Sequence, residues 1–583
     1  MGIDTFYITI NLFFLFISIL LITIQRFKIS SSFFGCQNRQ FKSDNYLFIF
    51  YNSFNPSCSI SFYSCVVLLL FCITLFTSVY KVGVVPSGLH VDEAGIAYDA
   101  LSVANYGVDR YLNPYPVYFI NFGGGQSALY TYLAAFFIRI FGYSVICVRL
   151  PAILVRLITF VAIYYITGRE YRDHPEKTLL LLLIFAVCPY FIMQSRWGLD
   201  CNLLVGLLAL SVSVLTAAVR HNSTTLYLLS GLSFGLSLYT YALSYIIIPI
   251  FLLLTFSYLY FVKRIKMNQV FKVVIPVFFF SVPLMAMILV NKGIIAEYKG
   301  LFTIPMLFFY RGGEISLNNI PNNLYIIFSL LSFDNPSIFG RQLFYNAVPY
   351  FGTVYYFSIP FFVIGLVSSS KASFRSIKNR EFSINTIFLL WLLSVFACQF
   401  LIYEPNINKS NAAFIPILFF IVEGIVNVAD HSKTIIVGIV FLYILNFILF
   451  FNYYFYQYNP DSKILIGFTT DYVDAIHFSK NLNSEKKVIL NNIAAAPYIY
   501  VLLENQVSPY CFRMNNIKTV YNSFHSTYSF RSAEDIKTDS LHVFQSGKED
   551  TAYIVFNNTD WNHWFNRMGY KNLPFGNVGV FYK

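Results

Sequence analysis

Charged residues are scarce in this sequence. Only 12% of its 583 residues are Asp, Glu, Lys or Arg, whereas 57% are hydrophobic. Soluble globular proteins carry about 25% charged residues. So few charges cannot cover the apolar surface of a soluble protein of this size, and lipid is therefore the expected solvent for most of the chain. The composition excludes a soluble globular fold and predicts a polytopic α-helical membrane protein.

Nucleotide-binding motifs are also missing. The sequence has no Walker A motif and no G-x-G-x-x-G after a strand. Cysteine is scarce after residue 455, where Cys511 is the only one, so no disulfide framework can form there.

A net charge of +12 would suit nucleic acid, but Lys and Arg fall in short loops between apolar runs. That distribution is the positive-inside pattern of membrane proteins and excludes a nucleic-acid partner. The basic loops are 25–42, 168–177, 263–272 and 371–380.

Apolar runs long enough to form membrane helices occur along the first 455 residues, which predicts about 11–12 transmembrane helices. The runs are 5–24, 59–80, 145–167, 178–193, 201–219, 225–240, 244–262, 270–290, 351–369, 383–402, 411–428 and 433–455. Basic residues follow the first run instead of preceding it, so we interpret that run as a retained span and not a signal peptide. The stretch 239–245 forms either a tight hairpin or a break in one long helix.

The positive-inside rule also predicts which segments lie outside. With 25–57 in the cytoplasm, the loops 81–144 and 291–350 and the chain after 455 are extracytoplasmic. Loop 81–144 predicts helices near 93–106 and 127–141, and the second helix is too short to span and belongs at the interface. The protein is therefore expected to be a multi-pass protein of the plasma membrane.

The apolar runs, the basic loops and the more polar tail divide the chain into three predicted domains. Residues 1–57 form an N-terminal span and cytoplasmic basic loop, 58–455 a transmembrane domain and 456–583 a small extracytoplasmic α/β domain. The last prediction rests on a helical segment, Pro497–Glu504, among three strand-like segments. Those strands are expected at Lys487–Leu490, Tyr553–Phe556 and Gly579–Tyr582.

An acidic pair, Asp92–Glu93, follows His90 just outside the run 59–80. Two carboxylates beside a membrane are costly unless they are paired, solvated or functional. A carboxylate in a partly desolvated pocket can hold a raised pKa and accept a proton from a hydroxyl. A helix N-terminus, whose dipole favours acidic side chains, explains the same pair equally well.

Further polar residues gather in the predicted outer loops. Gly124 and Gln126 belong to a glycine-rich stretch that permits a close backbone approach or a sharp turn. Arg149 ends a span, where it either snorkels or binds phosphate. Arg196 and Asp200 share a very short loop and form either a functional pair or a salt-bridged helix cap. Tyr111, with Tyr115 and Tyr118, either stacks on a sugar or belongs to an interfacial aromatic belt.

The order of these motifs resembles a known family. An acidic pair in the first outer loop is followed by a glycine-rich segment, the apolar stretch LYTYLAAFFIRIFGYS, then VRLP, and SRWGLD in the second outer loop. This order is similar to that of the GT-C membrane glycosyltransferases, especially the dolichyl-phosphate-mannose–protein mannosyltransferases and the bacterial lipid A aminoarabinose transferase. The resemblance is strongest over 81–205. Lys409 stands where relatives often have arginine, and Val91 where they often have proline.

The resemblance implies an enzyme of the hexosyl- or pentosyltransferase class. It would move a sugar from a polyprenyl-phosphate donor to an acceptor hydroxyl on the outer face, with inversion. Asp92 would be the base, Glu93 would orient Asp92 or a metal, and Asp200 would be a second acid. The other residues that the resemblance implicates are Arg149, Arg196 and Lys409 at the donor phosphate, and His90, Tyr111, Gly124 and Gln126 along the substrate.

Cofactor and partners are less defined. Some GT-C enzymes use a divalent metal and others do not, and Asp92 and Glu93 would be its ligands here. The acceptor is protein, lipid or an envelope polymer, and the bilayer itself is a partner. Two other functions remain open from the residues. A transporter or flippase would need charges within its spans, of which Arg156 and Glu423 are examples. The other alternative is that the protein is a non-catalytic component of envelope polysaccharide assembly.

Overall fold

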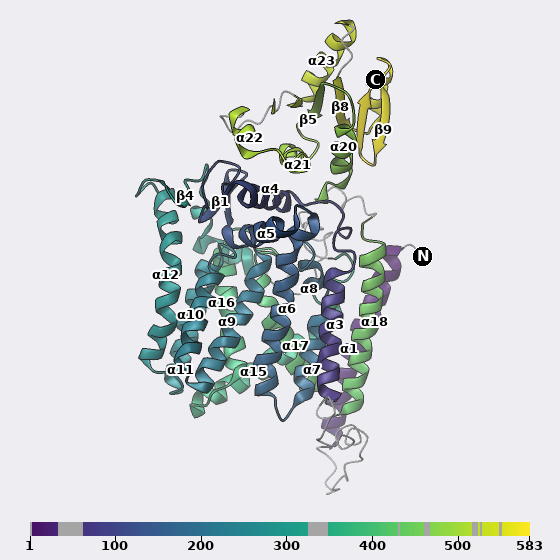
Figure 1. The fold of residues 1–583 in the computed structure, drawn as a ribbon. Helices are drawn as coiled ribbons and strands as arrows, with labels where there is room; N and C mark the ends of the chain where they lie inside the picture. Colours follow the sequence, from purple (N-terminus) through teal and green to yellow (C-terminus); the bar gives the residue numbers. More distant parts are fainter. Residues whose placement is uncertain are drawn as a thin grey trace.

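The computed structural model describes residues 3–32, 62–324, 348–429, 432–459, 467–515, 523–524, 527–546 and 551–583. Within these ranges, a bundle of helices carries a layer of short helices and hairpins at one end, and a smaller domain sits on that layer (Figure 1). The predicted fold class, a polytopic helical protein with a small C-terminal α/β domain, is confirmed.

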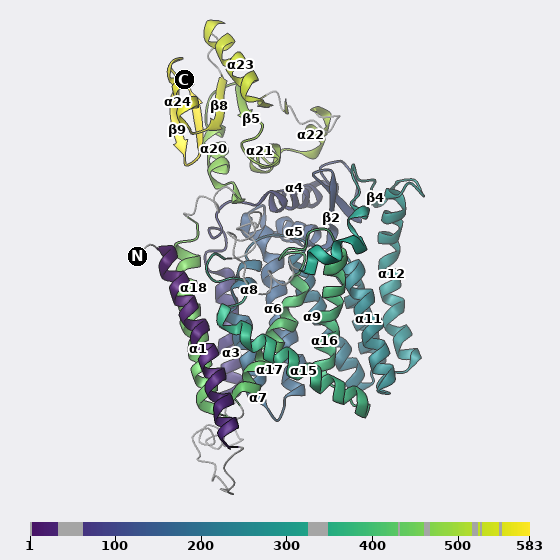
Figure 2. The same cartoon turned by 180° about the vertical axis from the view of Figure 1, so that it is seen from behind.

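Nine helical segments of the described residues are long and apolar enough to cross a membrane. The bundle consists of α1 (Ile3–Ser32), α3 (Phe62–Val79), α6 (Val145–Glu170), α7 (Pro175–Val187), α8 (Pro189–Gln194), α9 (Asn202–His221), α10 (Thr224–Ser237), α11 (Ser244–Phe261), α12 (Met267–Asn291), η3 (Tyr356–Ser358), α15 (Ile359–Asn379), α16 (Ile384–Leu401), η4 (Asn411–Ala413), α17 (Phe414–Ala429) and α18 (Lys433–Tyr456). The chain is an integral multi-pass membrane protein. Figure 2 shows α1 beside α18 at the edge of the bundle.

Two predicted spans differ from the structure in detail. The run 178–193 is not one helix, because α7 ends before Cys188 and α8 begins at Pro189. Proline has no N–H for a helical bond and disfavours helical geometry in the residue before it, and Cys188 is accordingly extended. Residues 238–243 separate α10 from α11, so the stretch 239–245 is not part of one continuous helix.

The layer at the end of the bundle is built from the first outer loop. Helices α4 (Val91–Tyr106) and α5 (Ala128–Phe141) lie across the helix ends, close to the predicted ranges (Figure 1). Between them, β1 (Tyr118–Asn121) and β2 (Gly124–Ser127) form an antiparallel hairpin. Its two turn residues, Phe122 and Gly123, both have positive φ, as a type I′ turn requires. The hairpin β3 (Tyr298–Lys299) and β4 (Thr303–Ile304), with η1 (Gly312–Glu314) and η2 (Leu317–Asn319), completes the layer.

The C-terminal domain is a six-stranded mixed sheet with helices. The strand order is β6-β7-β5-β8-β10-β9, and β5 is parallel to both β7 and β8. Its elements are α20 (Thr470–Lys480), β5 (Lys486–Leu490), α21 (Pro497–Glu504), α22 (Pro509–Asn515), β6 (Ser523–Phe524), β7 (Tyr528–Arg531), α23 (Ala533–Ser546), β8 (Thr551–Phe556), α24 (Thr559–Asn566), β9 (Lys571–Phe575) and β10 (Val578–Tyr582). All four predicted segments of the tail are present with their expected type.

The domain is not separated from the layer beneath it by solvent. One hydrophobic cluster joins buried residues of α4 and α5 to buried residues of α21 and the sheet. The bundle has its own larger cluster. The basic connections α6–α7, α9–α10, α11–α12 and α15–α16 lie at the opposite end from this layer (Figure 1). The layer and the C-terminal domain therefore lie at the same end of the bundle, opposite these basic connections.

Candidate functional site

The acidic pair lies in the first turn of α4, whose N-cap is His90. The backbone N–H of Asp92 donates to the His90 Nδ1 at 3.3 Å. This bond satisfies one of the N–H groups that a helix start leaves without a partner. Burial lowers the pKa of His90, although the nearby carboxylates oppose that shift. A neutral imidazole can accept this hydrogen bond, whereas a protonated one cannot.

The two acids of the pair have opposite surroundings. The side chain of Asp92 is 46% exposed and lies 3.7 Å from the His90 Nδ1. The side chain of Glu93 is completely buried. Successive residues of a helix point about 100° apart, so one acid faces the open side of the layer while the other points into it. Only Asp92 is placed to meet a substrate.

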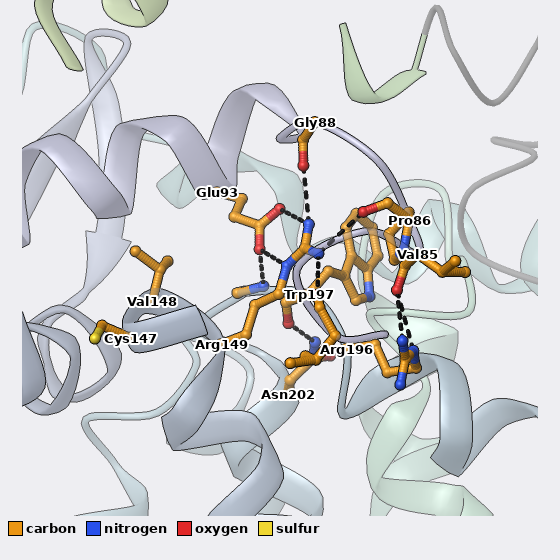
Figure 3. Close-up of polar contacts among 12 residues, drawn as sticks. Val85, Pro86, Gly88, Glu93, Cys147, Val148, Arg149, Arg196, Trp197 and Asn202 are labelled. Carbon is orange, nitrogen blue, oxygen red and sulfur yellow. Dashed lines mark hydrogen bonds and ion pairs between the residues drawn. The ribbon is translucent and has the colours of Figure 1, made fainter. Parts of the chain in front are cut away.

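Glu93 is held in a clamp with Arg149 (Figure 3). The Arg149 Nε and Nη2 donate to the two Glu93 carboxylate oxygens at 2.8 and 3.1 Å. Its remaining N–H groups donate to the carbonyls of Val82, Pro86 and Gly88. Gly198 N–H also donates to Glu93 Oε1 at 2.7 Å. All five Arg149 donors are therefore used, and the clamp ties α4 to α6 and to the loop before Asp200.

Arg196 is also occupied by the protein's own backbone. Its guanidinium is fully buried and donates to the carbonyls of Thr77, Ser78 and Val85 at 2.8–3.2 Å. It also lies over the Phe455 ring at 4.7 Å. Arg149 and Arg196, both expected at the donor phosphate, are used here to fix the chain between α3 and α4. Neither has the open fork of N–H groups that phosphate binding requires.

Asp200 lies at the start of α9 and reaches the glycine-rich hairpin. Its Oδ2 accepts from the Ser127 N–H at 3.1 Å, and its Oδ1 accepts from the Cys201 N–H at 2.8 Å. Burial raises the pKa of Asp200 to about 7, against those two hydrogen bonds, and the charge of Asp92 raises it further. The structure thus brings Asp92 and Asp200 close enough to interact, and carboxyl groups with shifted pKa values are typical of acid–base sites.

The hairpin residues expected along the substrate have different positions. Gln126 is 6% exposed, and its Oε1 has no hydrogen-bond partner among the described residues. A Cβ added to Gly124 would lie 3.1 Å from the Phe309 ring, so the glycine allows the loop after α12 to approach. Tyr111 contacts the Phe308 ring edge-on at 5.3 Å and lies under Arg513 at 5.2 Å. Its ring therefore already packs against protein side chains.

Two cations approach the site from later loops. Lys409 Nζ donates to the Tyr403 carbonyl at 2.6 Å, and burial lowers the pKa of Lys409. Arg311 was not identified from the sequence. Its side chain is 68% exposed, its Nε lies 3.8 Å from where a Gly124 Cβ would be, and its charge contributes to the lowered pKa of Lys409. Arg311 forms a weak ion pair with Glu314, in which Nε lies 3.8 Å from the Glu314 Oε1. The sequence did offer one signal for Arg311, because a basic residue is unusual in a predicted outer loop such as 291–350.

Metal ligands do not gather in the described part of the chain, where no three His, Cys, Asp or Glu side chains are close enough to hold an ion. Glu93, a proposed ligand, has both oxygens committed to the clamp. Asp92 and Asp200 are the carboxylates that remain able to meet a cation. Mg²⁺ is often held by one or two carboxylates together with substrate phosphate oxygens, so these two residues fit such a metal.

Comparison with known proteins supports the predicted resemblance. Residues 126–331 match the family model described as dolichyl-phosphate-mannose-protein mannosyltransferase. The matched segment begins at the glycine-rich hairpin and contains Asp200 and Arg311. The resemblance stated from the motifs is confirmed over that segment. No curated protein matches the chain.

The chain is also similar to solved structures of low sequence identity. ArnT from Cupriavidus metallidurans bound to undecaprenyl phosphate is 11% identical, with a TM-score of 0.47 over 89% of this chain and 97% of that chain. ArnT from the same organism in the apo state is 10% identical, with a TM-score of 0.48 over 89% of this chain and 96% of that chain. The archaeal oligosaccharyltransferase AglB from Archaeoglobus fulgidus, in complex with an inhibitory peptide and a dolichol-phosphate, is 12% identical, with a TM-score of 0.42. That match covers 89% of this chain and 74% of that chain.

Proposed function

We propose that this protein is a glycosyltransferase that moves a sugar from a polyprenyl-phosphate donor to an acceptor hydroxyl at the outer membrane face. The observation that carries the proposal is the exposed Asp92 on a firmly anchored helix start, beside Asp200 with its raised pKa. The family match over residues 126–331, which contain Asp200, supports the same chemistry. A lipid-linked donor explains why the acids lie against the end of a membrane bundle.

Asp92 acts as the general base in this proposal. It accepts the proton of the acceptor hydroxyl while the hydroxyl oxygen attacks the anomeric carbon from the face opposite the phosphate. The new glycosidic bond forms as the bond to the phosphate oxygen breaks, which inverts the anomeric centre. The electron pair leaves with the polyprenyl phosphate. Asp200 shares the site as a second acid that orients the acceptor.

The leaving phosphate needs positive charge where its negative charge develops. We assign this role to Arg311 and Lys409, because the guanidinium of Arg311 is exposed and Lys409 donates one N–H to protein. Arg149 and Arg196 are positioning residues in this scheme. His90, Gly124 and Gln126 line the acceptor side. Where a divalent cation is bound, Asp92 and Asp200 would hold it, and it would offset charge on the phosphate.

The remaining parts follow from the location. Residues 58–455 would form the catalytic domain and 456–583 an outer domain that contacts it. A separate cytoplasmic enzyme must load the lipid carrier, because the sequence has no nucleotide-binding motif. The acceptor is a hydroxyl of protein, lipid or envelope polymer.

The charged residues that would favour a transporter contact polar groups of the protein itself. Arg156 donates to Thr77, Ser78 and the Ala186 carbonyl at 2.9–3.0 Å. Glu423 accepts from Lys177 at 3.0 Å and from Tyr171 at 2.7 Å. These contacts tie helices of the bundle to one another, and a transporter does not need to be invoked to explain the two residues.

Replacement of the base tests the proposal. Purified full-length Asp92→Asn protein, given polyprenyl-phosphate mannose or aminoarabinose, should lose at least about a hundredfold in sugar release and transfer, as general-base removal does. Asp539→Asn, on the exposed face of α23, is the charge-matched control and should keep full activity. Thermal unfolding should be the same for all three proteins. A fully active Asp92→Asn protein would refute the assigned base, and lipid movement without sugar transfer would support a flippase.

A further inference from the structure

A polar cavity lies in the C-terminal domain, away from the acidic pair Asp92–Glu93. Its volume is about 430 Å³, and it opens where β5 and β7 begin, next to the segment between α21 and α22. Its lining is almost entirely polar or charged: Lys480, Lys487, Asn505, Gln506, Val507, Ser508, Thr527 and Tyr528. Two of these residues carry positive charge, and none of the described residues that line the cavity is acidic.

Lys487 is the unusual member of this lining. It is only 6% exposed, and its Nζ lies 5.4 Å from the centre of the Tyr528 ring. Among the described residues, that Nζ has no hydrogen-bond acceptor and no ion pair. Its backbone is fixed, because its N–H donates to Thr527 at 2.6 Å in the parallel β5–β7 pair. A partly desolvated ammonium group is costly, and burial lowers the pKa of Lys487 accordingly.

The carboxylate of Glu504, the residue before Asn505 in the lining, is directed elsewhere. Glu504 Oε2 pairs with His477 Nε2 at 2.8 Å, on α20. Lys480 Nζ donates to the Glu504 backbone carbonyl. The Glu504 charge interacts with Lys480, but no carboxylate of the described residues forms an ion pair with Lys487. An incoming oxyanion would supply the missing acceptor and charge.

We propose that this cavity is a binding subsite for the phosphate or carboxylate of a glycan. Lys480 and Lys487 bind the oxyanion, and the side chains of Asn505, Gln506, Ser508 and Thr527 hydrogen-bond the sugar hydroxyls. Amides and hydroxyls can both donate and accept, which suits the mixed requirements of a sugar. The volume is within the range of small-molecule sites.

The cavity is mechanically connected to the candidate active site. Val507 lines it, and the Val507 carbonyl accepts from the Tyr98 hydroxyl at 2.8 Å. Tyr98 belongs to α4, the helix that begins at the acidic pair. Resting on the proposed function, the bound glycan is the acceptor or part of an acceptor polymer. The oxyanion site itself does not depend on that function.

Calorimetry on the full chain in detergent tests the subsite without any donor. The probes are glucose 6-phosphate, glucuronate, inorganic phosphate and glucose. We expect both anionic sugars to bind, inorganic phosphate to bind at least fivefold more weakly than glucose 6-phosphate, and glucose to show no heat. Lys487→Met, which keeps the buried aliphatic volume, and Lys480→Gln should each weaken glucose 6-phosphate binding at least tenfold.

Lys486→Gln is the matched control, because its side chain is exposed next to Lys487 on the same strand. It should bind like the natural protein, as should Arg311→Gln and Asp92→Asn. The proposal is overturned if glucose 6-phosphate does not bind, if glucose binds equally well, or if neither lysine variant weakens binding. Equal binding of inorganic phosphate overturns the sugar contacts. Because Asp92→Asn keeps this binding while it loses transfer, failure of one proposal is distinguishable from failure of the other.

Discussion

Adjacent carboxylates at one helix start have separate duties in this protein. Asp92 remains open to the site, whereas both oxygens of Glu93 are bound by Arg149 and Gly198. A buried carboxylate–guanidinium pair is destabilising to break, because it leaves an uncompensated charge. The pair also holds the loop that carries Asp200. Glu93 therefore acts on catalysis through position and not through contact with the reacting atoms.

Breaking the clamp should affect folding before it affects chemistry. Glu93→Gln leaves the fully buried Arg149 without a counter-charge, so we expect a loss of about 3–5 kcal/mol in the free energy of unfolding, measured in detergent. Asp92→Asn, one residue earlier, removes an exposed charge and should change stability by less than about 0.5 kcal/mol. Glu93→Gln protein of normal stability but no activity would instead indicate a catalytic Glu93.

At the scale of single elements, the tightest packing lies between α15 and α17. A Cβ added to Gly365 would meet the Phe420 carbonyl, and one added to Gly424 would meet the Phe361 carbonyl. Small residues allow membrane helices to approach this closely, and van der Waals contact then stabilises the pair. These two glycines therefore set the distance between α15 and α17, and α17 directly follows η4 and the loop with Lys409.

Alanine at either glycine should separate α15 from α17. Because the obstructing atoms are backbone, the helices must shift, and we expect Gly365→Ala and Gly424→Ala each to cost about 1–3 kcal/mol, as overpacked cores do. Gly438→Ala on α18 is the control, since its added Cβ meets nothing within 4 Å. Thermal unfolding of the three variants decides the matter, and equal melting temperatures would contradict the packing argument.

Elements were more predictable than contacts. Hydrophobic run length and periodicity located α4, α5 and the strands β5, β8 and β10 of the C-terminal domain, because these signals are local, but they missed β6, β7 and β9. The same signals missed the break at Cys188, where Pro189 interrupts a continuous apolar run. They also could not distinguish Asp92 from Glu93 or reveal that Arg149 is fully used. Those facts depend on α6 and the loop at Gly198, which are distant in sequence.

At the scale of the whole molecule, the C-terminal domain supports the start of α4. The Leu89 N–H donates to the Phe468 carbonyl at 2.9 Å. The Leu89 carbonyl accepts from Thr469 Oγ1 at 2.9 Å and from the Tyr500 hydroxyl at 3.2 Å. Leu89 directly precedes His90, the N-cap. A domain that served only to select acceptors would not need to hold this turn, so we infer that it also orients Asp92.

Removal of these two side-chain bonds should therefore slow the reaction with the donor itself. In Thr469→Val/Tyr500→Phe protein, the Leu89 carbonyl loses both donors and the α4 start is less firmly held. Misplacement of a catalytic group by about 1 Å costs up to about a hundredfold, so we expect roughly a tenfold lower rate of donor hydrolysis with an unchanged donor KM. Thr538→Val/Tyr582→Phe, a matched pair elsewhere in the domain, should hydrolyse donor normally. Unchanged hydrolysis with impaired transfer in the first variant would instead restrict the domain to acceptor binding.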